Sequence, residues 1–218
     1  MSKLKELTVP NARPLPVIVL ADVSGSMNTD GKIQSLNQSL REMLESFKDE
    51  DDLRAEIHVA VMTFGKGTVR QHVPLATAAN AVWTDHPAAG DTPMGAAFRA
   101  AKQLVEDRNA IPGRSYRPTL VLLSDGQPTD DWKAPLDELL ASERGGKAFR
   151  MALGIGADAD MEVLSAFLHD PQARVFRADE ARQIRQFFRL VTMSVTSRSR
   201  SANPNVAPNV DAAEEWDL

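Results

Sequence analysis

The segment Asp-Val-Ser-Gly-Ser carries oxygen atoms on alternate side chains, Asp22, Ser24 and Ser26, directly after a strongly apolar run. Alternate side chains of an extended segment point to the same side of the backbone. Gly25 lies between the two serines and allows the backbone to turn sharply there. Converging oxygen atoms of this kind can cap a helix, close a turn or hold a metal ion. Residues elsewhere in the chain must distinguish these uses.

Two further segments supply oxygen atoms of the same kind. Thr92 lies in Gly-Asp-Thr-Pro-Met-Gly, and Asp125 follows another apolar run in Ser-Asp-Gly. Carboxylate and hydroxyl ligands without nitrogen or sulfur favour a hard cation such as Mg²⁺, and Mn²⁺ or Ca²⁺ fits the same set. Two carboxylates balance the divalent charge and the hydroxyls add none, so the cation stays electrophilic enough to take a partner's carboxylate. We predict a metal site made of Asp22, Ser24, Ser26, Thr92 and Asp125.

Strand and helix patterns alternate along the chain and must position these residues. Continuous apolar runs are typical of parallel strands covered on both faces, and apolar positions at helical spacing separate them. The predicted strands are 15–21, 55–65, 68–75, 118–126, 148–156 and 174–178. The predicted helices are 28–48, 93–105, 132–144, 160–169 and 179–195.

This alternation predicts an α/β fold with a doubly wound, mostly parallel central sheet and helices on both faces. The turn Gly65-Lys66-Gly67 makes a hairpin of the second and third strands, which suggests one antiparallel edge strand. Ligands of such sheets bind at the carboxyl ends of the strands, near the topological switch point. We therefore expect the three oxygen-bearing segments to meet at that edge.

The composition of the chain disfavours or excludes several kinds of function. The chain has 218 residues, a net charge of −5 and no cysteine. The charge and the lack of a basic stripe disfavour nucleic-acid binding, and the lack of cysteine excludes disulfides and thiolate ligands. The apolar runs are too short to cross a membrane, and the N-terminal segment lacks the pattern of a signal peptide. We expect a cytoplasmic protein that is not bound to a membrane.

The domain organisation follows from where the pattern begins and ends. Residues 1–14 are a polar lead-in, 15–195 form one domain, and 196–218 form a flexible acidic C-terminal tail. Serines and Thr196 lie among arginines at the start of this tail, which suggests phosphorylation by an associated kinase. The acidic end of the tail, 214–218, suggests self-association by docking on the metal face of another copy.

The five candidate ligands together resemble the metal-ion-dependent adhesion site of a von Willebrand factor type A (VWA) domain. The resemblance covers about residues 15–195. It implies that Ser24, Ser26 and Thr92 touch the metal, and that Asp22 and Asp125 often act through water. It also implies a binding protein without catalytic activity, whose partner supplies an Asp or Glu to the metal.

Four segments resemble the bacterial TerY-like group, which is associated with tellurium resistance: LPVIVLADVSGSM, VAVMTFG, GDTPMGAAF and LVLLSDGQPTDDW. This narrower resemblance implies a scaffold that works beside a Ser/Thr kinase and a PP2C-type phosphatase. An alternative is an adaptor of a MoxR-type AAA+ ATPase. Asp91 stands where many relatives have glycine, and we expect it to tune its loop.

Simpler interpretations of single segments remain open. Ser24 or Ser26 alone could cap a helix, and Asp125 with Gly126 could form a turn. Asp130 and Asp131 could cap the next helix or form an acidic rim. A metal-dependent phosphoester hydrolase is a less favoured alternative, because the sequence places no His, Lys or Glu as a general base beside the site.

Overall fold

The computed structural model describes residues 12–50 and 55–206, which form a six-stranded sheet in the order β3-β2-β1-β4-β5-β6. β3 pairs antiparallel with β2, and the remaining pairs are parallel. The strands are β1 (Arg13–Asp22), β2 (Ala55–Gly65), β3 (Thr68–Thr77), β4 (Thr119–Ser124), β5 (Phe149–Ile155) and β6 (Phe176–Ala178). The predicted fold class, with its antiparallel edge strand, is confirmed.

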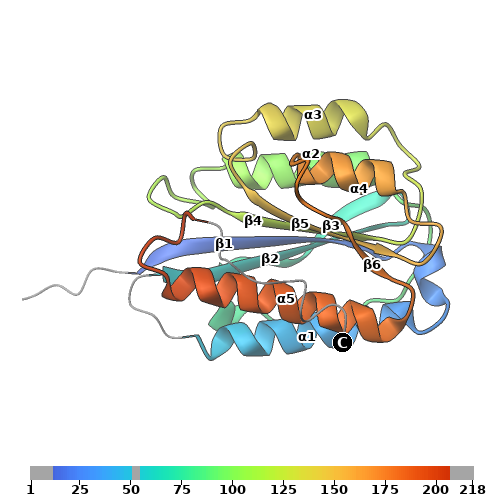
Figure 1. The fold of residues 1–218 in the computed structure, drawn as a ribbon, viewed down its shortest axis with the longest axis horizontal. Coiled ribbons are helices and arrows are strands. Elements are labelled where there is room, and N and C mark those ends of the chain that lie inside the picture. The colour runs from blue at the N-terminus through green and yellow to red at the C-terminus, as the bar shows by residue number, and fades with distance from the viewer. Residues whose placement is uncertain (1–11, 51–54, 207–218) are drawn as a thin grey trace, which may run out of the picture.

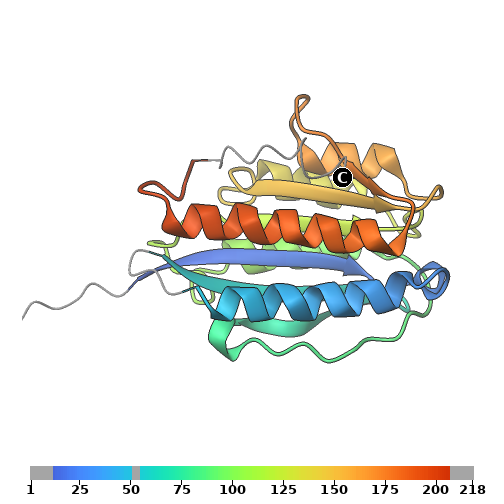
Figure 2. The same ribbon diagram turned by 60° about the horizontal axis from the view of Figure 1, so that its bottom comes forward.

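Helices cover both faces of this sheet, with α1 and α5 on one face and α2, α3 and α4 on the other (Figure 1). The bounds are α1 (Lys32–Lys48), α2 (Met94–Glu106), α3 (Lys133–Ala141), α4 (Met161–Leu168) and α5 (Ala181–Arg200), with short 3₁₀ helices η1 (Gly25–Asn28) and η2 (Ala78–Asn80). α1 and α5 lie side by side (Figure 2), and the Ser35 hydroxyl on α1 donates to the Ala181 carbonyl at 2.6 Å.

The central strand β1 is buried on both faces, which explains its uninterrupted apolar sequence. Val17 and Val19 pack with the core beneath α1 and α5, whereas Ile18 and Leu20 pack with the core beneath α2 and α4. The side chains of all four residues are fully buried. β1 is therefore held on two sides, and its last residue is placed rigidly.

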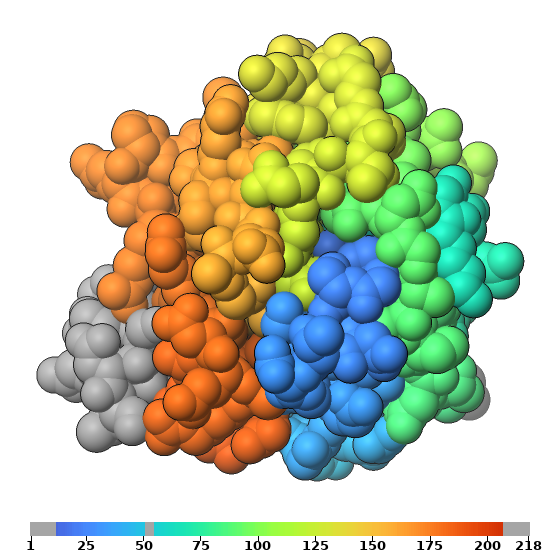
Figure 3. All heavy atoms as spheres, turned by 90° about the vertical axis from the view of Figure 1, so that its right-hand side faces the viewer, coloured from blue at the N-terminus to red at the C-terminus, as the bar shows by residue number. Residues whose placement is uncertain are grey.

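The chain reverses its direction of winding at β1. β2 lies on one side of β1 and β4 on the other. The helices that follow β1 and β4 leave on opposite faces of the sheet (Figure 1). The space-filling view shows a crevice beyond the carboxyl ends of these two strands (Figure 3). Asp22 ends β1 and Asp125 directly follows β4, so the first and last candidate ligands border this crevice.

Helix boundaries near the candidate site differ from the prediction. The helix expected over 28–48 is interrupted, because Asp30 and Gly31 adopt left-handed conformations with φ of 54° and 72°. η1 and α1 are therefore separate helices. Pro93 precedes α2 and is not its first residue.

The C-terminal helix extends past the predicted end of the domain at residue 195. Arg198 is only 1% exposed, and its guanidinium donates to the Pro204 carbonyl at 2.8 Å and the Thr119 hydroxyl at 2.5 Å. It also lies 4.1 Å from the centre of the Phe149 ring. Residues 196–206 are thus packed against the domain, and the prediction that the tail begins at 196 is wrong. Ser199 is buried, which removes it as an accessible phosphorylation site.

β1 begins at Arg13, inside the predicted lead-in of residues 1–14. Residues 1–11 of the lead-in and 207–218 of the predicted tail lie outside the described residues. Docking by 214–218 belongs to that part. None of the helices in residues 12–50 and 55–206 combines the length and apolar character needed to cross a bilayer.

Candidate metal centre

Asp22 is held by hydrogen bonds to both of its carboxylate oxygens. Oδ1 accepts from the Ser24 backbone N–H at 2.8 Å, and Oδ2 accepts from the Ser124 hydroxyl at 2.5 Å. Ser124 is the last residue of β4, so this contact links the ends of the two strands that border the crevice. The side chain of Asp22 is therefore fixed from both β1 and β4.

Burial raises the pKa of Asp22 from 3.8 to about 6. Asp22 is 0% exposed, and loss of hydration disfavours its ionised form. Hydrogen bonds from Ser124 and Ser24 lower the pKa and offset part of this effect. A cation beside Asp22 would stabilise the ionised carboxylate, so the site favours a positively charged ligand.

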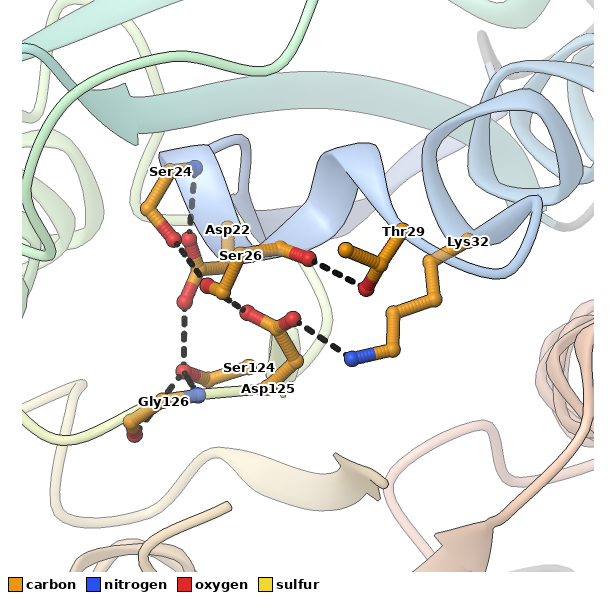
Figure 4. A network of polar contacts seen from close by, with 8 residues as sticks. All are labelled: Asp22, Ser24, Ser26, Thr29, Lys32, Ser124, Asp125 and Gly126. Atoms are coloured by element: carbon orange, nitrogen blue, oxygen red, sulfur yellow. Dashed lines mark hydrogen bonds and ion pairs between the residues drawn. The ribbon is translucent and has the colours of Figure 1, made fainter. Parts of the chain in front are cut away.

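A line of hydroxyl contacts joins the first candidate segment to the third (Figure 4). The Ser24 and Ser26 hydroxyl oxygens lie 3.0 Å apart, and the Ser26 hydroxyl donates to Asp125 Oδ1 at 2.6 Å. Ser24 precedes η1 but does not cap it with its side chain. The simple helix-cap interpretation of Ser24 is therefore wrong.

Backbone hydrogen bonds bring the Thr92 loop to the Asp-Val-Ser-Gly-Ser segment. The Ala89 N–H donates to the Val23 carbonyl, and the Gly25 N–H donates to the Gly90 carbonyl, both at 2.8 Å. Gly90 has a φ of 81°, and a Cβ on it would lie 2.4 Å from the Lys66 Cα. A larger residue would therefore push the loop away from the site.

Thr92 reaches the same place as the other four candidate ligands. A Cβ on Gly126 would lie 3.5 Å from the Thr92 hydroxyl oxygen and 3.7 Å from the Ser26 hydroxyl oxygen. The Thr92 and Thr129 loops are joined, because the Thr129 N–H donates to the Thr92 carbonyl at 3.0 Å and the Thr92 N–H donates to the Thr129 hydroxyl at 3.2 Å. The structure thus brings all five predicted site residues together.

Asp130 and Asp131 differ in role. Asp130 accepts from the Gly95 and Ala96 N–H groups, both at 2.8 Å, and so caps α2 from another loop. The expectation that it caps the following helix is wrong. Asp131 accepts from the Lys133 N–H at 3.2 Å, at the start of α3 as expected. Its carbonyl lies against Gly95, where a Cβ would approach within 1.9 Å.

Asp91 contacts the turn between β2 and β3, where its carboxylate accepts from the Gly67 N–H. This contact agrees with the expectation that Asp91 tunes its own loop. Because its carboxylate is engaged by Gly67, Asp91 is not counted among the candidate metal ligands.

Two residues at the site, Ser124 and Lys32, are not among the residues predicted from the sequence. Ser124 is adjacent to Asp125 in sequence and could have been found as a polar end to an apolar strand. Lys32 places its ammonium nitrogen 2.9 Å from Asp125 Oδ2 across 93 positions of sequence, and no pattern signalled this contact. The sequence did not indicate any lysine beside the site, and the absence of a general base there stays a prediction.

The donor atoms fit a hard divalent cation. Carboxylate and hydroxyl oxygens meet here, where Figure 3 shows a hollow between the segments that follow β1, precede α2 and follow β4. In residues 12–50 and 55–206, no group of three or more His, Cys, Asp and Glu side chains is arranged to hold a metal ion. Metal binding at this site therefore depends on the hydroxyl groups as well as the two carboxylates.

The family model of the von Willebrand factor type A domain matches residues 17–190. The chain belongs to this family. No curated protein matches the sequence.

Solved structures with the same fold include three from different settings. The pilus adhesin SpaC from Lactobacillus rhamnosus GG has a TM-score of 0.67 at 17% identity, over 86% of this chain and 30% of the adhesin. The ArnB paralog VWA2 from Sulfolobus acidocaldarius has a TM-score of 0.60 at 14% sequence identity. The match covers 86% of this chain and 46% of the paralog. Proximal thread matrix protein 1 from the mussel byssus, with a zinc-occupied MIDAS motif, has a TM-score of 0.61 at 16% sequence identity. The match covers 84% of this chain and 48% of the byssus protein. The chain spans less than half the length of these proteins.

Proposed function

We propose that the chain is a metal-dependent protein-interaction module that binds an Asp or Glu side chain of a partner. The observation that carries this proposal is the convergence of three hydroxyls and two carboxylates at the carboxyl ends of β1 and β4. Such a ligand set neutralises a divalent cation without supplying a further negative charge. A bound Mg²⁺ would offer an electrophilic position to an outside carboxylate.

The side chains divide this work. Ser24, Ser26 and Thr92 are the proposed neutral ligands, and Asp22 and Asp125 balance the charge, directly or through water. The short contact between Ser24 and Ser26 and the hydrogen bond from Ser26 to Asp125 place these oxygens beside one another. Ser124 orients Asp22 through its hydroxyl.

A relative supports a divalent metal at this position. Proximal thread matrix protein 1 is described with a zinc-occupied MIDAS motif, and it shares this fold. We propose Mg²⁺ for the present chain, with Mn²⁺ or Ca²⁺ as substitutes, because all the candidate donors are oxygen atoms.

We also propose that the site binds and does not catalyse. His72 packs against Trp83 and His86, and His58 contacts Glu56. Lys32 is bound to Asp125 by its ammonium group and so is engaged as a cation. These contacts leave the hydrolase alternative without an assigned general base.

The cellular setting is a finer proposal that rests on the resemblance of four segments to the TerY-like group. In that setting the module would act in the cytoplasm as a scaffold with a Ser/Thr kinase and a PP2C-type phosphatase in tellurium resistance. An adaptor of a MoxR-type ATPase is the competing setting. Partner identification distinguishes the two, because one yields a kinase or phosphatase and the other an ATPase.

Affinity purification from the source cells, in Mg²⁺ or in EDTA, tests the proposal. We expect partners to be retained in Mg²⁺ and lost in EDTA, and Asp22→Ala and Thr92→Ala to lose them in Mg²⁺ while remaining folded by circular dichroism. Thr68→Ala, which removes an exposed hydroxyl on β3, is the matched control and should behave as the wild type. Equal recovery of partners by Thr92→Ala and the wild type would refute the metal-dependent site.

A further inference from the structure

Lys32 places a fixed positive charge inside the proposed metal site. Its ammonium nitrogen lies 2.9 Å from Asp125 Oδ2, while the other oxygen of Asp125 accepts from Ser26 at 2.6 Å. The Asp125 side chain is 0% exposed and that of Lys32 is 17% exposed. Both oxygens of a desolvated carboxylate are therefore engaged, one of them by a cation (Figure 4).

The position of Lys32 on its helix is electrostatically unfavourable. Lys32 is the first residue of α1, where the unpaired backbone N–H groups carry partial positive charge and acidic side chains are preferred. Helix formation therefore gives no reason for a lysine here. The charge of Lys32 is stabilised by Asp125 instead, so its role is to be sought at the site.

Local backbone conformation aims this side chain at the site. The left-handed residues Asp30 and Gly31 turn the chain so that α1 begins beside the site, and side chains on a helix lean toward its N-terminus. On the opposite side, Gly156 directly follows β5, and a Cβ on it would lie 3.3 Å from the Lys32 nitrogen. The absence of a side chain at Gly156 thus leaves space for the ammonium group, and the left-handed φ of 72° at Gly31 sets the start of α1.

The charge of Lys32 acts in opposite directions on the binding of the metal ion and on the binding of the partner's carboxylate. It competes with a metal ion for Asp125 and repels it, which weakens metal binding. It also leaves the metal-loaded site with one more positive charge than Asp22 and Asp125 alone would give. That excess favours an incoming carboxylate, which can pair with the ammonium group as well as with the metal.

We propose that Lys32 couples metal binding to partner binding by lowering the affinity for the metal alone and raising the affinity for an acidic side chain. This inference rests on the proposed metal-dependent function. It assigns to Lys32 a role in selecting partners that present a carboxylate.

Titration with Mn²⁺, followed by the electron paramagnetic resonance signal of the free ion, tests whether Lys32 lowers the affinity for the metal. We expect Lys32→Met to bind Mn²⁺ about tenfold more tightly than the wild type, because competition and repulsion are both removed. Lys32→Arg keeps the charge and should stay close to the wild type. Lys48→Met removes one charge from the far end of α1, where Lys48 pairs with Glu45, and should also stay close.

The outcomes separate this inference from the proposed function. If the wild type binds Mn²⁺ and Lys32→Met binds it equally or more weakly, Lys32 only holds Asp125 in place and the inference is wrong, while the metal site stands. If Lys32→Met binds Mn²⁺ and the wild type does not, the inference is supported in its strongest form. Absence of binding to every variant overturns the metal site and the inference together.

The same titration in the presence of acetate, as the carboxylate probe, tests whether Lys32 raises the affinity for an acidic side chain. Chloride at equal ionic strength is the control. We expect acetate to tighten Mn²⁺ binding to the wild type about threefold more than to Lys32→Met, because only the wild type offers both cations to the carboxylate. An equal effect of acetate on the two proteins would show that Lys32 has no part in carboxylate recognition and would overturn the coupling.

Discussion

At the scale of single residues, the site is defined by how each side chain is restrained. Asp22 is fixed by Ser24 and Ser124, Ser26 joins Asp125, and Lys32 compensates the charge of Asp125. These hydrogen bonds and the ion pair restrain the positions of the side chains. Preorganisation of this kind lowers the entropic cost of binding.

The raised pKa of Asp22 leads to a pH-dependent prediction. The pKa is about 6 in the folded protein against 3.8 ordinarily, so the folded state holds the proton more tightly than the unfolded state. Stability from this group is fully present below about pH 4 and is lost as the pH rises through 6. In EDTA at pH 7, we expect Asp22→Asn to be more stable than the wild type by up to about 3 kcal/mol.

Urea unfolding in EDTA at pH 4 and pH 7 measures this difference. Asn keeps an oxygen for the Ser24 N–H and can donate to the Ser124 hydroxyl, so the variant should retain the local geometry. The advantage of Asp22→Asn should nearly vanish at pH 4. A difference of the same size at both pH values would mean that ionisation of Asp22 does not destabilise the fold.

At the scale of elements, the loop that follows β4 holds the start of α2, a helix that precedes β4 in the chain. Asp130 follows β4 in sequence, yet it caps α2 at Gly95 and Ala96. Thr129 is paired with Thr92 in the same way. The position of Thr92 therefore depends on the loop that also carries Asp125.

Removal of the Asp130 carboxylate should disturb both stability and the site. We expect Asp130→Ala to lose about 1–2 kcal/mol of unfolding free energy, because two N–H groups of α2 lose their acceptor. Mn²⁺ binding should weaken as well, because the Thr92 loop loses a restraint. Asp131→Ala is the neighbouring control, and we expect a smaller effect on both urea unfolding and Mn²⁺ titration. If the two variants behave alike, Asp130 is an ordinary surface cap.

At the scale of the whole molecule, the sequence predicted the layers better than their boundaries. The apolar runs of β1 and β4 identified the central strands, and the oxygen-bearing residues after them identified the site. Arg198 and Lys32 escaped prediction because their partners, Thr119 and Asp125, lie far away in sequence. A segment rich in serine and arginine resembles a solvated tail, and only tertiary contacts extend α5 through it.

Arg198 should therefore contribute to global stability. We expect Arg198→Ala to lose about 2–4 kcal/mol of unfolding free energy, because buried hydrogen-bond acceptors such as the Pro204 carbonyl lose a charged donor. Arg200→Ala is the matched control, because Arg200 is exposed and its pair with Glu50 should contribute less than about 1 kcal/mol. Urea unfolding of both variants measures the contrast, and equal losses would contradict the role assigned to Arg198.

The pairing of β1 with β4 has a consequence for biosynthesis. The strands are neighbours in the sheet, although about a hundred residues separate Asp22 from Ser124. Contacts between distant segments form slowly, because closing the long intervening loop costs entropy. A ribosome that has released only the first half of the chain has not yet supplied Asp125, so no early intermediate carries the complete ligand set. A metal ion at the proposed site would then stabilise the finished domain by mass action and would not assist its nascent forms.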